Sequence, residues 1–146
     1  MKVVRAVALI ALGFLAVTAI WGSALLMASP LGSPMQIPVS MLKFSPFHSF
    51  LIPGILLLVS SGLLGIVVFL LTLFRVSRYG WWIAIQGCVL FAWITTEVIM
   101  LRTIVWLHYL YWGMALLLVV CGWVLRNPAP KPVSVTGLGA MSASRH

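Results

Sequence analysis

Two strongly apolar segments of the chain meet in the stretch WITTEVIMLRTIVWLH, residues 93–108. This stretch contains Glu97, the only acidic residue of the chain, together with Arg102 and His108. An ionised side chain near hydrocarbon is costly and usually faces the protein interior and a partner. Because the polar break between the segments is short, it predicts two apolar helices that form an antiparallel hairpin, with polar groups near its tip.

The composition of the chain indicates a membrane protein. Of its 146 residues, 63% are hydrophobic and 7% are charged, which is too little polar surface for the shell of a soluble domain. The net charge of +8 does not indicate nucleic acid binding, because the basic residues stand at the ends of apolar runs, where membrane topology places them. We therefore expect the lipid bilayer, and no nucleic acid, as a partner.

Four apolar runs are long enough to cross a bilayer, since a spanning helix needs about 20 residues. In lipid every backbone polar group must be satisfied inside a helix or a closed barrel. The runs therefore predict an all-α bundle of four transmembrane helices in one domain, residues 1–126. The first run also has features of a signal peptide, but its apolar part is longer than a normal signal sequence, so we expect an uncleaved helix. The predicted helices cover residues 4–28, 49–74, 81–101 and 104–125.

The connections between these helices differ in character. Residues 29–48 contain four prolines and predict a Pro-rich loop between helices 1 and 2, folded over the outer end of the bundle. A second helix that starts at Ser45 has Pro53 inside it, which predicts a kink over residues 49–54. Residues 127–146 have few large apolar side chains, so we expect a disordered cytoplasmic tail.

The distribution of positive charge predicts the orientation of the bundle. If the N-terminus is cytoplasmic, seven basic residues lie inside and two, Lys43 and Arg102, lie outside. Because cytoplasmic loops carry the excess of Lys and Arg, this split predicts that both termini are cytoplasmic.

Polar and aromatic residues of the last two helices predict a layer near the outer end of the bundle. Gln86, Trp93 and Glu97 have the spacing of one helix face. A tight hairpin brings His108 of the fourth helix to a depth similar to that of Glu97. The hypothetical ligand-binding residues are Glu97, His108, Arg102, His48, Trp93, Gln86, Tyr111 and Trp112.

Two interpretations of this layer are open. Glu97 could pair with Arg102 or His108 and fasten the hairpin, without further chemistry. Alternatively, the layer could form a small outward-facing pocket for a lipid head group, a quinone-like ring or a proton-coupled solute.

Small residues predict close helix packing. Gly54, Ser61 and Gly65 lie at offsets of seven and four, and therefore on one helix face, and Gly13 lies on a small-residue face of the first helix. Such faces let another helix approach closely, either within this chain or from a membrane-protein partner or a second copy.

Catalytic, metal and cofactor motifs are not recognised in the sequence. One Glu and no Asp cannot supply paired carboxylates, the histidines have no zinc-site spacing, and the two cysteines form no C-x-x-C. We expect no cofactor and no metal. The leading hypothesis is an assembly or accessory component that acts through helix packing. The alternatives are a small-molecule or lipid binder or transporter that uses Glu97 and His108, and a membrane enzyme of lipid or quinone chemistry.

The run IPVSMLKFSPFHSFLIPG, residues 37–54, resembles one seen in small uncharacterised bacterial four-helix membrane proteins. The stretch from Glu97 to His108 is similar to theirs as well. The resemblance covers about residues 37–112 and implies a multi-pass protein of the bacterial inner membrane, without an assigned activity.

Overall fold

The computed structural model describes residues 1–28 and 49–126, and every regular element in these two ranges is a helix. Four helical segments are long and apolar enough to cross a membrane, as the sequence predicts. The second of them is continuous from Leu51 to Leu73 but contains a π-helical segment. The elements are α1 (Lys2–Ala28), α2 (Leu51–Leu57), the π-helix η3 (Leu58–Leu63), α3 (Leu64–Leu73), α4 (Tyr79–Leu101) and α5 (Trp106–Arg126).

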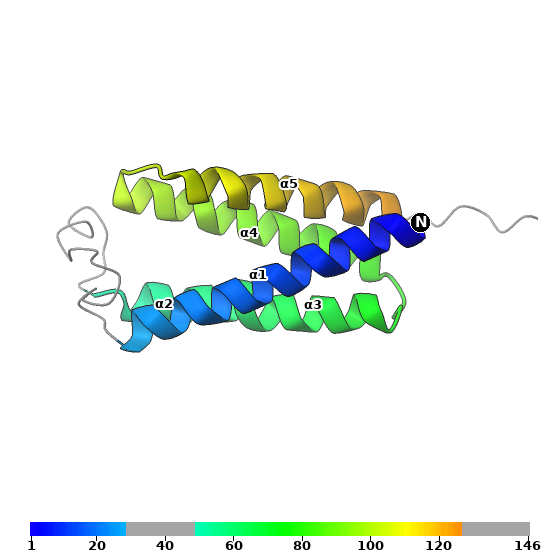
Figure 1. Ribbon diagram of the computed structural model, residues 1–146, viewed down its shortest axis with the longest axis horizontal. Coiled ribbons are helices and arrows are strands. Elements are labelled where there is room, and N and C mark those ends of the chain that lie inside the picture. Colours follow the sequence, from blue (N-terminus) through cyan, green and yellow to red (C-terminus); the bar gives the residue numbers. More distant parts are fainter. Residues whose placement is uncertain (29–48, 127–146) are drawn as a thin grey trace, which may run out of the picture.

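The helices form two pairs. The antiparallel helices α4 and α5 lie side by side along their length, joined by residues 102–105 (Figure 1). The second pair consists of α1 and the line of α2, η3 and α3. Near the N-terminus α1 also packs against α5, but toward Ala28 it follows α2, and the two pairs diverge (Figure 1).

One buried apolar cluster joins all four spans. Its largest fully buried side chains include Leu12 of α1, Val68 of α3, Ile83 of α4 and Leu118 of α5. Most of these residues lie in the half of the bundle where α1 contacts α5. This half therefore contains the tightly packed core of the bundle. In the other half the two helix pairs diverge, and a space lies between them.

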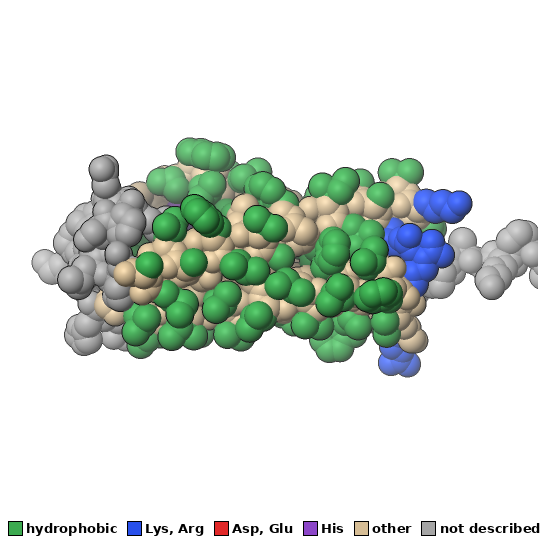
Figure 2. Space-filling view, turned by 60° about the horizontal axis from the view of Figure 1, so that its bottom comes forward, with side chains coloured by type: hydrophobic (Ala, Val, Ile, Leu, Met, Phe, Trp, Pro, Cys, Tyr) green, Lys and Arg blue, Asp and Glu red, His purple; other side chains and the backbone are tan. Residues whose placement is uncertain are grey.

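The outward-facing side chains are suited to lipid. The face seen in Figure 2 is largely hydrophobic, and Lys and Arg gather at the end of the bundle that holds the N-terminus. The basic residues at the helix ends on this side are Lys2, Arg75, Arg78 and Arg126. An apolar belt with charge at its end is the surface of a multi-pass membrane protein.

The predicted kink at Pro53 is wrong. The second span begins at Leu51, so Pro53 is its third residue, where a backbone N–H has no helical partner to lose. The irregularity lies one turn later, in η3, where the N–H of Leu64 bonds to the carbonyl of Val59, five residues back. The predicted start at Ser45, the Pro-rich loop 29–48 and the tail 127–146 lie outside the described residues.

Candidate functional site

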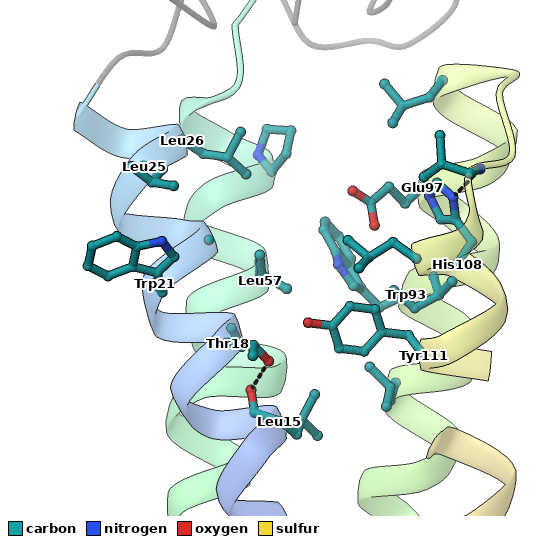
Figure 3. A pocket seen from close by; sticks show the side chains of 18 of the residues that line it. Leu15, Thr18, Trp21, Leu25, Leu26, Leu57, Trp93, Glu97, His108 and Tyr111 are labelled. Atoms are coloured by element: carbon teal, nitrogen blue, oxygen red, sulfur yellow. Dashed lines mark hydrogen bonds between the residues drawn. The ribbon is translucent and has the colours of Figure 1, made fainter. Parts of the chain in front are cut away.

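A cavity of about 670 Å³ lies where the two helix pairs diverge. It is bounded by α1 and α2 on one side and by α4 and α5 on the other (Figure 3). Its walls are mostly apolar, with Leu15, Leu25 and Leu26 from α1 and Leu57 from α2. Cavities of this size and apolar character are typical of small-molecule sites.

Glu97 is a half-buried residue of α4, and its side chain points into this cavity, toward α1 and α2 (Figure 3). Within the two described ranges, its carboxyl group makes no hydrogen bond and no ion pair. The pairing with His108 that the sequence left open is therefore not formed. The only acidic side chain of the chain therefore faces the cavity without a partner from the described residues.

His108 lines the same cavity from the first turn of α5 and is 7% exposed. Its Nδ1 accepts a hydrogen bond from the backbone N–H of Val105 at 3.0 Å. This bond gives the backbone N–H of Val105, just before α5, a hydrogen-bond acceptor. Because Nδ1 is the acceptor, the proton of a neutral imidazole is on Nε2. The His108 ring is therefore held in a fixed orientation at the wall of the cavity.

Two aromatic residues complete the polar side of the cavity. Trp93 lies next to Glu97 on α4, and Tyr111 points its hydroxyl toward α1 and α2 (Figure 3). The indole Nε1 of Trp93 is buried and has no hydrogen-bond partner in the part of the chain that the structure describes. Because a buried indole N–H normally finds an acceptor, this donor is suited to a polar atom of a bound molecule.

Three of the other residues predicted for this layer, Trp112, Arg102 and Gln86, do not line the cavity. Trp112 donates from Nε1 to the hydroxyl of Thr95 at 3.3 Å and does not line the cavity. Arg102 ends α4 at the hairpin tip with a φ of 47°, and His48 lies outside the described residues. The structure thus brings together four of the eight predicted residues: Glu97, His108, Trp93 and Tyr111.

Gln86 belongs to a separate polar cluster next to η3. Its side chain is fully buried, and Nε2 donates to the carbonyl of Ser60 at 3.2 Å. In a regular α-helix the carbonyl of Ser60 would accept a hydrogen bond from the N–H of Leu64. In the π-helical segment the N–H of Leu64 bonds to the carbonyl of Val59 instead. Gln86 therefore supplies a donor to a carbonyl that the register shift leaves available. Within residues 1–28 and 49–126, the amide oxygen of Gln86 and the hydroxyls of Ser60 and Ser61 have no hydrogen-bond partner.

Replacing Gln86 by Met is expected to have a small effect, because it removes both a hydrogen bond and an unpartnered amide oxygen. Hydrogen bonds between membrane helices average about 0.6 kcal/mol, so the free energy of unfolding should fall by about 1 kcal/mol or less. Equilibrium unfolding in mixed micelles measures it, with Cys88→Met on the exposed side of α4 as the control. If Gln86→Met lowered the free energy of unfolding by more than about 3 kcal/mol, the hydrogen bond of Gln86 would contribute more to stability than proposed.

The small residues predicted for packing are used between α1 and the second span. A Cβ on Gly65 would lie 3.6 Å from the Cβ of Ala16, and one on Gly54 would lie 3.1 Å from that of Leu26. Ser61 is fully buried, whereas Gly13 is only half-buried and would touch only the ring of Phe69, at 3.6 Å or more.

The closest helix contact involves three glycines that the sequence analysis missed. A Cβ on Gly80 would lie 2.7 Å from the backbone carbon of Leu125, and one on Gly87 would lie 2.7 Å from the carbonyl oxygen of Ala115. A Cβ on Gly122 of α5 would lie 2.6 Å from the carbonyl oxygen of Gly80 in α4. The signal was present in the sequence as Gly80, Ala84 and Gly87, small residues spaced four and three apart.

Comparison of the chain with protein-family models, with curated proteins and with solved structures finds no match. The chemistry of the site is therefore derived from its own residues. An apolar space with one carboxyl group and fixed hydrogen-bonding groups along one wall can hold a molecule that is apolar over most of its surface and polar at one end. Such a molecule is soluble in the membrane that surrounds the bundle.

Proposed function

We propose that this protein binds a small amphiphilic molecule from the membrane in the cavity between the two helix pairs. The observation that carries the proposal is the position of Glu97, whose carboxyl group faces about 670 Å³ of mostly apolar space and has no partner among residues 1–28 and 49–126. A residue of this kind within a membrane span is expensive to keep and marks a functional site by default. Binding or transport, rather than catalysis, is the activity that this arrangement supports.

The same arrangement supports an orientation for the binding site. The cavity lies at the end of the bundle where α4 and α5 are joined, and the basic helix ends Lys2, Arg75, Arg78 and Arg126 lie at the opposite end. Under the positive-inside rule we place the basic end in the cytoplasm, with both termini there. The cavity then belongs to the outer half of the membrane, and the resemblance noted above favours the bacterial inner membrane.

An assembly role has less support. Of the small residues that motivated it, Gly54 and Gly65 pack against α1 of the same chain, and Ser61 is fully buried, so this face is already used inside the bundle. Crosslinking in native membranes tests this role directly. Recovery of a specific dimer or hetero-complex would restore it.

The substitution Leu57→Trp tests the proposed function, because Leu57 projects from α2 into the cavity (Figure 3). A larger side chain there leaves less room for a bound molecule. Native mass spectrometry of the protein released from its own membrane compares the amount of co-purified small molecules. We expect the bound fraction of Leu57→Trp to fall about fivefold.

The matched control for this experiment is Leu56→Trp. Leu56 is the neighbouring residue on α2, is 42% exposed and does not line the cavity. It should retain the same bound molecules as the natural protein. Equal binding by both variants, or no bound molecule in any of them, would rule out the cavity as the binding site.

A further inference from the structure

We infer that the molecule held in this cavity has a cationic ammonium head and that Glu97 is its counter-ion, an inference that rests on the proposed function. The first observation concerns the charged residues that line the cavity. Among the described residues that line it, Glu97 is the only acidic one, and Lys and Arg do not occur. The described part of the wall also contains one histidine, His108, whose Nδ1 accepts a hydrogen bond from the backbone N–H of Val105.

These wall residues would interact differently with a cationic, an anionic and a neutral head group. A carboxylate facing apolar space is stabilised when a cation enters beside it, because the cation replaces the water that the carboxylate lost. An anionic head would be repelled by Glu97 and would find no arginine or lysine among the described residues of the wall. A neutral head would leave the carboxylate without a counter-charge. An ammonium head is therefore the one that uses Glu97.

The aromatic residues beside Glu97 are the second observation. Trp93 and Tyr111 project with Glu97 into the same space (Figure 3). Aromatic faces attract ammonium ions, and the attraction is larger where water is excluded. The N–H of Trp93, which has no acceptor among the described residues, can in addition donate to an oxygen atom close to the ammonium group. A carboxylate next to aromatic rings is thus a site built for an organic cation.

Two sources share this chemistry. One is a free alkylamine or similar organic cation dissolved in the membrane, and the other is a membrane lipid with an ethanolamine head group. Both have an ammonium group, and both have an apolar part that the walls of the cavity can accept. Lipids with an ethanolamine head also supply oxygen acceptors near the nitrogen.

The test uses the full-length purified protein in detergent and three probes of equal chain length at neutral pH: decylamine, decanol and decanoate. Equilibrium dialysis measures the dissociation constant of each. We expect decylamine to bind about tenfold more tightly than decanol, and decanoate to bind more weakly than both. In Glu97→Gln, which keeps the size of the side chain and removes its charge, the preference for decylamine over decanol should disappear while decanol still binds.

Each outcome bears on a different statement. Equal binding of decylamine and decanol by the natural protein would overturn the ammonium inference and leave the cavity as a binding site. Binding of none of the three probes above the level of Leu57→Trp would overturn the proposed function itself. The comparison of probes on the natural protein needs no substitution, so it decides the question even if Glu97→Gln does not fold.

A second pair of probes identifies the source of the cation. The ethanolamine and glycerol forms of a lysophospholipid with the same acyl chain differ in the ammonium group. Retention of the ethanolamine form, lost in Glu97→Gln, would assign the site to a lipid. Binding of decylamine without retention of the ethanolamine form would assign it to a free organic cation. Retention of the glycerol form in preference would contradict the ammonium inference.

Discussion

Replacing Gly122 by alanine is expected to destabilise the bundle by about 3 kcal/mol, the upper part of the usual range for an overpacked site. A Cβ at this position would lie 2.6 Å from the carbonyl oxygen of Gly80 and 2.8 Å from the Cα of Ala84. These are backbone atoms of α4, so no side chain can rotate away. The added methyl group must push α4 and α5 apart, which disturbs the closest helix contact of the fold.

The control for this prediction is Gly113→Ala on the same helix. A Cβ on Gly113 would have no neighbour within 4 Å, so the substitution adds a methyl group in open space. Alanine is the better helix former by about 1 kcal/mol in water, and the stability should therefore stay equal or rise slightly. Equilibrium unfolding in mixed micelles measures both variants. Similar losses for Gly122→Ala and Gly113→Ala would mean that α4 and α5 do not approach as closely as described.

Shortening Leu118 to alanine is expected to lower the free energy of unfolding by about 2 kcal/mol. Leu118 is fully buried in the cluster that joins the four spans. In water, such a truncation loses both transfer free energy and packing, and costs 2–5 kcal/mol in all. Lipid tails are as apolar as leucine, so only the lost packing and the cavity contribute here, and the value should lie at the low end of that range.

Leu116→Ala is the matched control, since it makes the same change two residues earlier on α5. Leu116 is 58% exposed on the outer surface, so its removal leaves no internal cavity. A change below about 0.5 kcal/mol is expected for it. If Leu116→Ala cost as much as Leu118→Ala in the same unfolding experiment, α5 would be rotated relative to the orientation in this structure.

The sequence predicted the four spanning helices and the hairpin of α4 and α5 because these depend on local properties. The length of an apolar run and the shortness of residues 102–105 are visible without any tertiary contact. Helical spacing together with the hairpin also placed Glu97 and His108 at similar depth. The error at Pro53 had a local cause as well, since it depended on where the second helix begins.

Three features were decided only by tertiary structure. The rotation of α4 and α5 about their axes is set by the close contact of Gly80, Gly87 and Gly122. In this arrangement Trp112 of α5 bonds to Thr95 of α4 and does not line the cavity that Glu97 faces. The register shift of η3 depends on backbone hydrogen bonds and on a donor from another helix, Gln86.

The cavity is the third such feature. It exists because α1 leaves α5 to follow α2, and a spacing pattern on one helix cannot predict where two helix pairs diverge. The sequence alone therefore determined which residues are costly to keep within the membrane. The packing of the two helix pairs decided that Glu97 faces an open apolar space rather than a partner within the described chain, since the direction of a side chain is set by the helix contacts around it.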